Sequence, residues 1–149
     1  MSDEWYDSCS ASVIQLELDT LADDQGYFRM SFGFDLKPLI DSIDATGLLN
    51  LPVVWEQDGR VHVVSGYRRV LALREIGRQK VECRAIPTST SKARCMLLNF
   101  HDNLPTRPLN QVEKAMTCSR LASLIPRREV IDRYMPALGL SSHDKTLEL

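Results

Sequence analysis

The sequence predicts an α+β fold in which a lobe that contains β-strands precedes an all-helical lobe. Strand-like patterns occur within the first 87 of the 149 residues, and helical patterns dominate the rest. The stretch Thr88-Ser-Thr-Ser91 is short and polar, so we place the boundary between residues 1–87 and 88–149 at this point. The hydrophobic fraction of 44% and the charged fraction of 26% are those of an ordinary globular chain.

The first lobe is expected to begin with a strand over residues 13–18. Ile14, Leu16 and Leu18 alternate there with polar residues, which predicts that these three side chains face inward. Residues 27–34 are a weaker strand candidate.

A helix is expected after Asp35, which is suited to cap it, and Gly47 offers a left-handed C-terminal cap. The remaining predicted elements of this lobe are a hairpin of residues 52–56 and 60–64 around an Asp-Gly turn, a helix over 67–76 that ends at Gly77, and a strand over 81–87.

The second lobe is expected to hold helices over residues 91–100, 110–124 and 127–134. A Pro/Gly turn and the first turns of another helix should follow, a pattern typical of the start of a helix-turn-helix. Because the sequence ends on Leu147-Glu-Leu149 without a cap, we expect it to stop before or within the recognition helix. A helical hairpin that packs on the lobe or on a second protomer is the alternative.

The charge of the chain is polarised along its length. Its 18 basic and 20 acidic residues give a net charge of −2, which by itself predicts no polyanionic partner. Residues 1–67, however, carry −9, residues 68–133 carry +8, and residues 134–149 carry −1. Such asymmetry favours binding of phosphate or nucleic acid.

Other sequence features predict a cytoplasmic protein with no membrane partner. No apolar run approaches the roughly 18 residues of a membrane span, and the N-terminus lacks the features of a secretory signal. The cysteines at positions 9, 83, 95 and 118 form no Cys-x-x-Cys pair, so they indicate neither a zinc site nor a disulfide framework. We expect Cys83 and Cys118 to be small buried hydrophobic residues.

The segment Ser65-Gly-Tyr-Arg-Arg69 lies where a predicted strand passes into a predicted helix, a place that favours an anion. Gly66 lets the backbone approach a phosphate, and Arg68 and Arg69 supply charged donors. Two cations in the first turn oppose the helix dipole, which indicates that an external anion compensates for them. A capped helix with solvated arginines is the alternative.

A second candidate segment is His101-Asp-Asn-Leu-Pro-Thr-Arg107. Asp102 and Asn103 carry the oxygen ligands that magnesium prefers beside a nucleotide phosphate, and Arg107 could reach another phosphate. A helix-ending loop of turn-forming residues is the alternative, and we interpret His101 as a surface or packing residue.

Several separated motifs occur in a fixed order between about residue 12 and residue 122. They are Leu39-Ile-x-Ser-Ile-x-x-x-Gly-Leu-Leu-Asn50-x-Pro-Val-Val, Val63-Val-Ser-Gly-Tyr-Arg-Arg-x-x-Ala-Leu, Gly77 to Cys83-Arg84, Asp102-Asn-Leu and Leu109-Asn-x-x-Glu-Lys-Ala. In order and spacing they resemble the N-terminal domain of ParB-type proteins. That family includes chromosome and plasmid partition proteins, nucleoid-occlusion relatives and ParB-like nucleases, and sulfiredoxin shares the fold.

The resemblance implies a lobe with a small mixed sheet that binds CTP with Mg²⁺, followed by a helical lobe and DNA binding through a helix-turn-helix. It also implies a homodimer, a possible Walker-type ATPase partner and a nucleoid-associated location. Carried over residue by residue, it assigns the triphosphate to Gly66, Arg68 and Arg69 with flanking Ser65 and Tyr67, the metal to Asp102 and Asn103, and the base and sugar side to Gly47, Leu48 and Asn50.

The chain departs from the pattern of the family at three positions. Tyr67 stands where many partition proteins have a Glu tied to CTP hydrolysis, which argues against efficient turnover. Asp102 replaces a Glu, and Thr106 replaces an expected Arg, with Arg107 one place later. Sulfiredoxin chemistry is disfavoured, since it requires a Cys in the loop over residues 65–69.

These observations support a ParB-like partition or regulatory protein in which a nucleotide acts as a conformational switch. A nuclease or phosphoryl-transfer enzyme on the same fold is the alternative, with Asp102, Glu75 or Asp44 as candidate bases. A protein-interaction domain with a degenerate pocket is a third possibility. Further possible phosphate or DNA contacts, equally compatible with a solvated face, are Arg127, Arg128 and Arg133.

Overall fold

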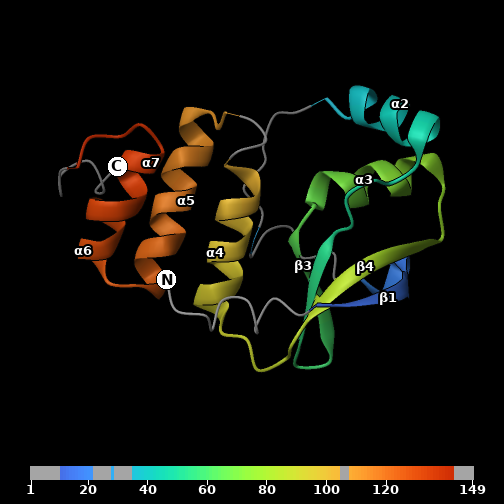
Figure 1. Ribbon diagram of the computed structural model, residues 1–149, viewed down its shortest axis with the longest axis horizontal. Coiled ribbons are helices and arrows are strands. Elements are labelled where there is room, and N and C mark those ends of the chain that lie inside the picture. Colours follow the sequence, from blue (N-terminus) through green and yellow to red (C-terminus); the bar gives the residue numbers. More distant parts are fainter. Residues whose placement is uncertain (1–10, 22–27, 29–34, 105–107, 143–149) are drawn as a thin grey trace. The chain divides into compact units, whose positions relative to one another are not determined.

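The computed structural model describes residues 11–21, 28, 35–104 and 108–142, and Figure 1 shows the arrangement of their helices and strands. The chain divides into two compact units, Met1–Thr90 and Ser91–Leu149. The strand predicted at residues 27–34, apart from Phe28, and the helix start predicted near the C-terminus lie outside the described residues.

The first unit is built on a mixed four-stranded sheet with the order β1-β4-β2-β3. Its strands are β1 (Ser12–Glu17), β2 (Val53–Gln57), β3 (Arg60–Ser65) and β4 (Lys80–Ile86). β1 and β4 are antiparallel, β2 and β3 are antiparallel, and β2 and β4 are parallel. The predicted α+β class is therefore confirmed.

The hairpin of β2 and β3 forms for the local reason that the sequence indicates. Gln57 pairs with Arg60, and both residues between them have positive φ, 52° at Asp58 and 73° at Gly59. Positive φ at both central positions is the conformation of a type I′ turn, whose twist matches that of the strands it joins.

Two helices, α2 (Lys37–Thr46) and α3 (Tyr67–Ile76), pack against each other (Figure 1). The N-cap of α2 is Leu36, one residue after the predicted cap, while the Asp35 Oδ1 accepts a hydrogen bond of 3.0 Å from the Lys37 N–H. The C-cap of α3 is Gly77 with φ 83°, which matches the predicted helix end.

The core of this unit lies where α2 and α3 meet one face of the sheet. Val54 of β2 is 1% exposed and belongs to this core, while the adjacent Trp55 points to the opposite face and packs edge-on against Phe28. The buried members of the core are Leu18, Leu21, Ile43, Val54, Val70, Ala72, Leu73, Val81 and Cys83.

The first strand differs from its prediction at both ends. β1 stops at Glu17, and Leu18 starts a short 3₁₀ turn, η1 (Leu18–Thr20), in which it is buried. Ile14 lies on the core face of the sheet, as expected, but it remains 37% exposed. The reason is that β1 is the edge strand of the sheet, so that burial of its side chains depends on only one neighbouring strand.

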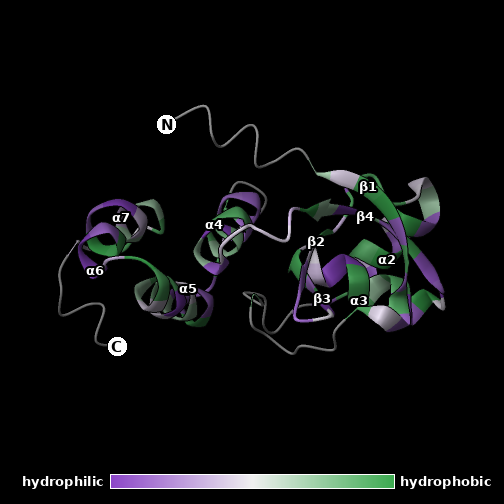
Figure 2. Cartoon of the chain, turned by 90° about the horizontal axis from the view of Figure 1, so that it is seen from below, coloured by the Kyte–Doolittle hydropathy of each residue, from purple (hydrophilic) through white to green (hydrophobic). Residues whose placement is uncertain are grey.

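The second unit consists of helices, and the first two start at clear caps. In α4 (Lys92–Asn103), the Ser91 side chain accepts from the Arg94 N–H. In α5 (Gln111–Leu124), Asn110 and Glu113 form a reciprocal capping box. Figure 2 shows apolar and polar residues on the same helices, as expected of helices with one buried side.

The last helical stretch runs further than predicted. It comprises α6 (Arg127–Glu129), the π-helical segment η2 (Val130–Tyr134) and α7 (Met135–Ala137). The predicted end at Tyr134, just before Pro136, is wrong. Pro136 has no N–H to offer to a regular α-helical ladder, but the wider π turn of η2 interrupts that ladder before Pro136, and the helical stretch continues to Ala137.

The three described cysteines, Cys83, Cys95 and Cys118, are all buried with free thiols. The predicted role of Cys83 and Cys118 as small hydrophobic residues is confirmed. Burial raises the pKa of Cys83 to about 11 and that of Cys95 to about 12. In the described part of the chain, no helix is both long and apolar enough to cross a membrane.

Candidate functional site

The candidate phosphate loop is centred on Gly66, the residue between β3 and α3. Gly66 caps the helix with φ 91° and ψ 25°, and its carbonyl accepts from the Val70 N–H at 3.1 Å. A Cβ at this position would lie 3.0 Å from the Pro52 Cα and 3.2 Å from the Arg69 Nη1. Both the positive φ and the close approach of Pro52 therefore require glycine here.

The second feature of the loop is a long-range contact made by Arg69. Its Nη1 donates to the carbonyl oxygens of Asn50 at 3.1 Å and Leu51 at 3.2 Å. This contact joins the first turn of α3 to the segment that enters β2. The segment expected at the base and sugar of a nucleotide and the segment expected at its phosphates are thus held together in the first unit.

The flanking residues of the loop differ in exposure. Ser65 is buried and pairs with Val53 at a register shift of the hairpin, where the strand leaves regular geometry just before Gly66. Tyr67 and Arg68 are half-buried. The first turn of α3 therefore follows directly on a buried strand end.

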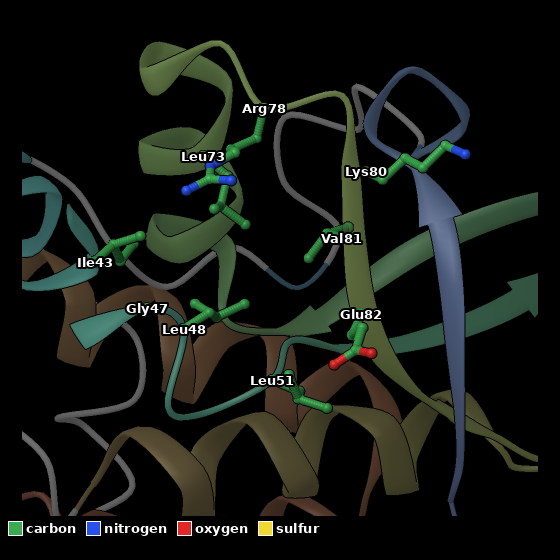
Figure 3. A pocket seen from close by; sticks show the side chains of 9 residues that line it. All are labelled: Ile43, Gly47, Leu48, Leu51, Leu73, Arg78, Lys80, Val81 and Glu82. Carbon is green, nitrogen blue, oxygen red and sulfur yellow. The ribbon is translucent and has the colours of Figure 1, made fainter. Parts of the chain in front are cut away.

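A pocket of about 290 Å³ lies beside the same connecting segment (Figure 3). Gly47 and Leu48, two of the residues expected on the base and sugar side, line it, whereas Asn50 does not. The other lining residues come from α2, from α3, from β4 and from the segments that precede β2 and β4, and they are Ile43, Leu51, Leu73, Arg78, Lys80, Val81 and Glu82.

The residues predicted to contact a metal belong to the second unit, at the end of α4. Asp102 is exposed. The Asn103 Nδ2 donates to the Asn99 carbonyl at 2.8 Å and to the Asn99 Oδ1, so only the Asn103 Oδ1 is suited to bind a cation. Among the described residues, no three His, Cys, Asp or Glu side chains are grouped as a metal site. Arg107 lies outside the described residues.

His101 packs in an aromatic cluster of the second unit. Its ring centroid lies 5.3 Å from that of Phe100 and 6.3 Å from that of Tyr134, both edge-on. Burial and the charge of Arg133 lower the pKa of His101. These contacts agree with the interpretation of His101 as a packing residue.

The arginines predicted as possible phosphate or DNA contacts lie on the last helical stretch. The Arg128 Nε lies 2.9 Å from the Asp132 Oδ2, and the Arg133 Nη1 lies 3.9 Å from the Glu129 Oε1. Both are i,i+4 pairs on an exposed helix surface, where a pair contributes little to stability. Arg127 is exposed on the same stretch.

Two structural residues escaped the sequence-based search. The close approach of Pro52 to Gly66 was not predicted, because Pro52 and Gly66 lie 14 positions apart in sequence. The motif that contains Asn50 and Pro52 was the available signal. Glu113 is 0% exposed, and its Oε2 accepts from the Asn110 N–H at 2.9 Å. The Asn-x-x-Glu spacing of a capping box was the available signal for Glu113.

Comparison with known proteins gives structural matches only. No protein-family model matches the chain, and no curated protein matches it. A solved Pnob8-like ParB-N domain matches over 85% of this chain and 50% of its own, with 13% identity and a TM-score of 0.63. The chain thus spans about half the length of that protein.

Two further matches are structures of the C-terminally truncated chromosome-partitioning protein ParB from Caulobacter crescentus. The one complexed with CTP-γ-S matches over 88% of this chain and 73% of its own, with 22% identity and a TM-score of 0.54. The one complexed to the centromeric parS site matches over 91% and 68%, with 16% identity and a TM-score of 0.53. The fold expected from the sequence motifs is therefore confirmed as ParB-like.

Proposed function

We propose that this chain is a ParB-like DNA-binding partition or regulatory protein whose first unit binds a nucleotide, CTP with Mg²⁺, as a conformational switch. The observation that carries the proposal is the joined geometry of Gly66 and Arg69. A glycine at positive φ begins α3 against Pro52, and Arg69 links that helix turn to the carbonyls of Asn50 and Leu51.

This geometry suits a phosphate group. Gly66 begins the ten-residue α3 at positive φ, and the helix dipole at this N-terminus favours negative charge. Arg68 in the first turn adds a permanently charged, fork-shaped donor. The fit is thus one of backbone conformation and charge.

The residues assigned to the metal fit Mg²⁺ in type. Mg²⁺ is usually held by one or two protein carboxylate or amide oxygens together with phosphate oxygens and water. The Asp102 carboxylate and the Asn103 Oδ1 would hold it, and the bound ion would neutralise charge on the triphosphate. Because these residues belong to the second unit, a nucleotide that contacts both units would favour one arrangement of the two over others.

The alternative, a nuclease or phosphoryl-transfer enzyme, has less support from the described residues. Glu75 is exposed nine residues after Gly66 in the same helix, about 13 Å further along the axis. Asp44 is exposed near the end of α2. Asp102 is left as the candidate base, so metal-dependent nicking of plasmid DNA that Asp102→Ala abolishes would favour the enzyme.

Calorimetric titration of CTP with Mg²⁺ tests the proposal. We expect the wild-type protein to bind and Arg68→Ala to lose at least about tenfold in affinity, since a hydrogen bond to a charged group contributes about 1.5–3 kcal/mol. Arg60→Ala is the matched control, because Arg60 is exposed at the opposite end of β3 from Ser65 and should leave binding unchanged.

Equal affinity of wild type and Arg68→Ala, or binding by neither, would refute the nucleotide switch. Absence of binding across a panel of nucleotides would instead favour a protein-interaction domain. Repeating the titration with DNA fragments tests the proposed DNA partner, because a switch requires that nucleotide and DNA alter each other's affinity by the same factor.

A further inference from the structure

The outer side of β1 carries a row of backbone hydrogen-bonding groups with which no described strand pairs. β1 is an edge strand, and it pairs with β4 along its whole length from Ser12 to Glu17. Just beyond the strand, the Leu18 N–H donates to the Gln79 carbonyl at 2.8 Å. In an antiparallel ladder alternate residues bond to the same neighbour, so the N–H and C=O groups of Val13, Gln15 and Glu17 face away from β4.

Within β1 itself, several of the devices that usually protect an edge strand are absent. β1 contains no Pro, Gly or Lys, and its pairing with β4 shows no register shift. Val13 is 58% exposed and Ile14 is 37% exposed, on opposite faces of the strand. At the other edge of the sheet, Val61 of β3 is bridged by Leu21.

We propose that β1 pairs antiparallel with β1 of a second copy of this chain, about a two-fold axis that passes through Gln15. In this register Gln15 lies opposite Gln15 of the second copy, and Val13 lies opposite Glu17, so the outward backbone groups of the two strands meet. Ile14 then lies opposite Leu16 on the face that carries the core, which forms an apolar cross-strand pair on each side of the axis.

The charges on the other face are complementary in this register. Val13 pairs with Arg84 of β4, and Glu17 pairs with Lys80, whose Nζ lies 3.5 Å from the Glu17 carboxylate. Each row across the joined sheet therefore runs from Lys80 through Glu17 to Val13 and Arg84 of the second copy. The Arg84 guanidinium has no side-chain hydrogen bond or ion pair within the described residues, and it gains a carboxylate two strands away.

The antiparallel direction follows from the same charges. A parallel, in-register pair would bring Glu17 beside Glu17 and Val13 beside Val13, which costs repulsion between like charges. A single pair of six-residue strands buries little area, so the contact belongs to the weak, transient class of interfaces. It should therefore depend strongly on protein concentration.

Gln15→Pro is the sharpest test, because the Gln15 N–H faces the free edge and its loss leaves the ladder with β4 intact. We expect sedimentation of the wild-type protein up to about 1 mM to show a dimer, and Gln15→Pro to weaken it by at least about tenfold through two lost hydrogen bonds. Gln15→Thr, which keeps the N–H, should still form the dimer. Circular dichroism verifies that each variant is folded.

Cross-linking gives a second test that does not depend on proline. Gln15→Cys in a Cys9→Ser background should form a disulfide with its own copy, because opposed residues of a hydrogen-bonded pair lie about 5.5 Å apart at Cα, within the range of about 4.4–6.8 Å for a disulfide. Glu56→Cys, on the exposed side of β2, should not. A protein that stays monomeric at these concentrations, or a dimer that Gln15→Pro and the cysteine variants leave unaffected, would overturn the pairing.

Discussion

Replacing Gly66 by Ala should destabilise the first unit more than the same change at Gly77. The two glycines have nearly the same backbone conformation, φ 91° and ψ 25° against φ 83° and ψ 21°. An Ala in this left-handed region costs about 1–2 kcal/mol at either position. They differ in surroundings, because a Cβ at Gly77 would meet nothing within 4 Å, whereas one at Gly66 would lie 3.0 Å from the Pro52 backbone.

The contact with Pro52 sets the expected difference. Relief of a backbone contact of this length requires a local shift, which costs about 1–3 kcal/mol in packed regions. We therefore expect Gly66→Ala to lose about 2–5 kcal/mol of unfolding free energy and Gly77→Ala about 1–2 kcal/mol. The comparison removes the conformational cost and isolates the close approach of the segment before β2.

Urea denaturation followed by circular dichroism and by fluorescence of the buried Trp55 measures both variants. With a urea dependence of about 2 kcal/mol per M, the midpoints of the two variants should differ by about 0.5–1.5 M. Equal midpoints, or a larger loss at Gly77, would refute the argument that Pro52 confines Gly66.

Three further predictions concern contacts on other elements. Arg69→Met should cost about 1–2 kcal/mol in urea denaturation, because it removes the donor to the carbonyls of Asn50 and Leu51; an unchanged midpoint would contradict this. Asn110→Ala should lower the free energy of unfolding by about 1–2 kcal/mol and Ser91→Ala by about 0.5–1 kcal/mol. The first change breaks a reciprocal capping box that includes the buried Glu113, whereas the second removes a single cap, so the reverse order would contradict the reasoning. Burial raises the pKa of Cys83 to about 11 and that of Cys95 to about 12, so the unfolded chain loses these thiol protons at lower pH than the folded chain does. The free energy of unfolding should therefore fall as the pH rises from about 9 towards 11. The double variant Cys83→Ala with Cys95→Ala should flatten that fall, and an unchanged slope would refute the reasoning.

Local chemistry made several elements of the fold predictable. The Asp58-Gly59 turn, the cap at Gly77 and the start of α5 at Asn110 all depend on residues within a few positions of one another. The exposure of Ile14 was not predictable in this way, because it depends on the position of β1 at the edge of the sheet. Strand order is set by contacts between distant segments, which hydrophobic alternation within one strand does not encode.

The candidate site shows the same division, and it changes which residue tests the proposed function. From the sequence, two arginines in the first turn of α3 oppose the helix dipole and indicate an external anion. In the structure, the Arg69 Nη1 is engaged by the carbonyls of Asn50 and Leu51, which lie 19 and 18 positions away, so part of that cost is offset inside the protein. Removing Arg69 would loosen the connecting segment as well as any phosphate contact, and a loss of nucleotide affinity in that variant would have two explanations. A bound anion is therefore best tested at Arg68, whose substitution, compared with that of Arg60, separates phosphate binding from the stability of the loop.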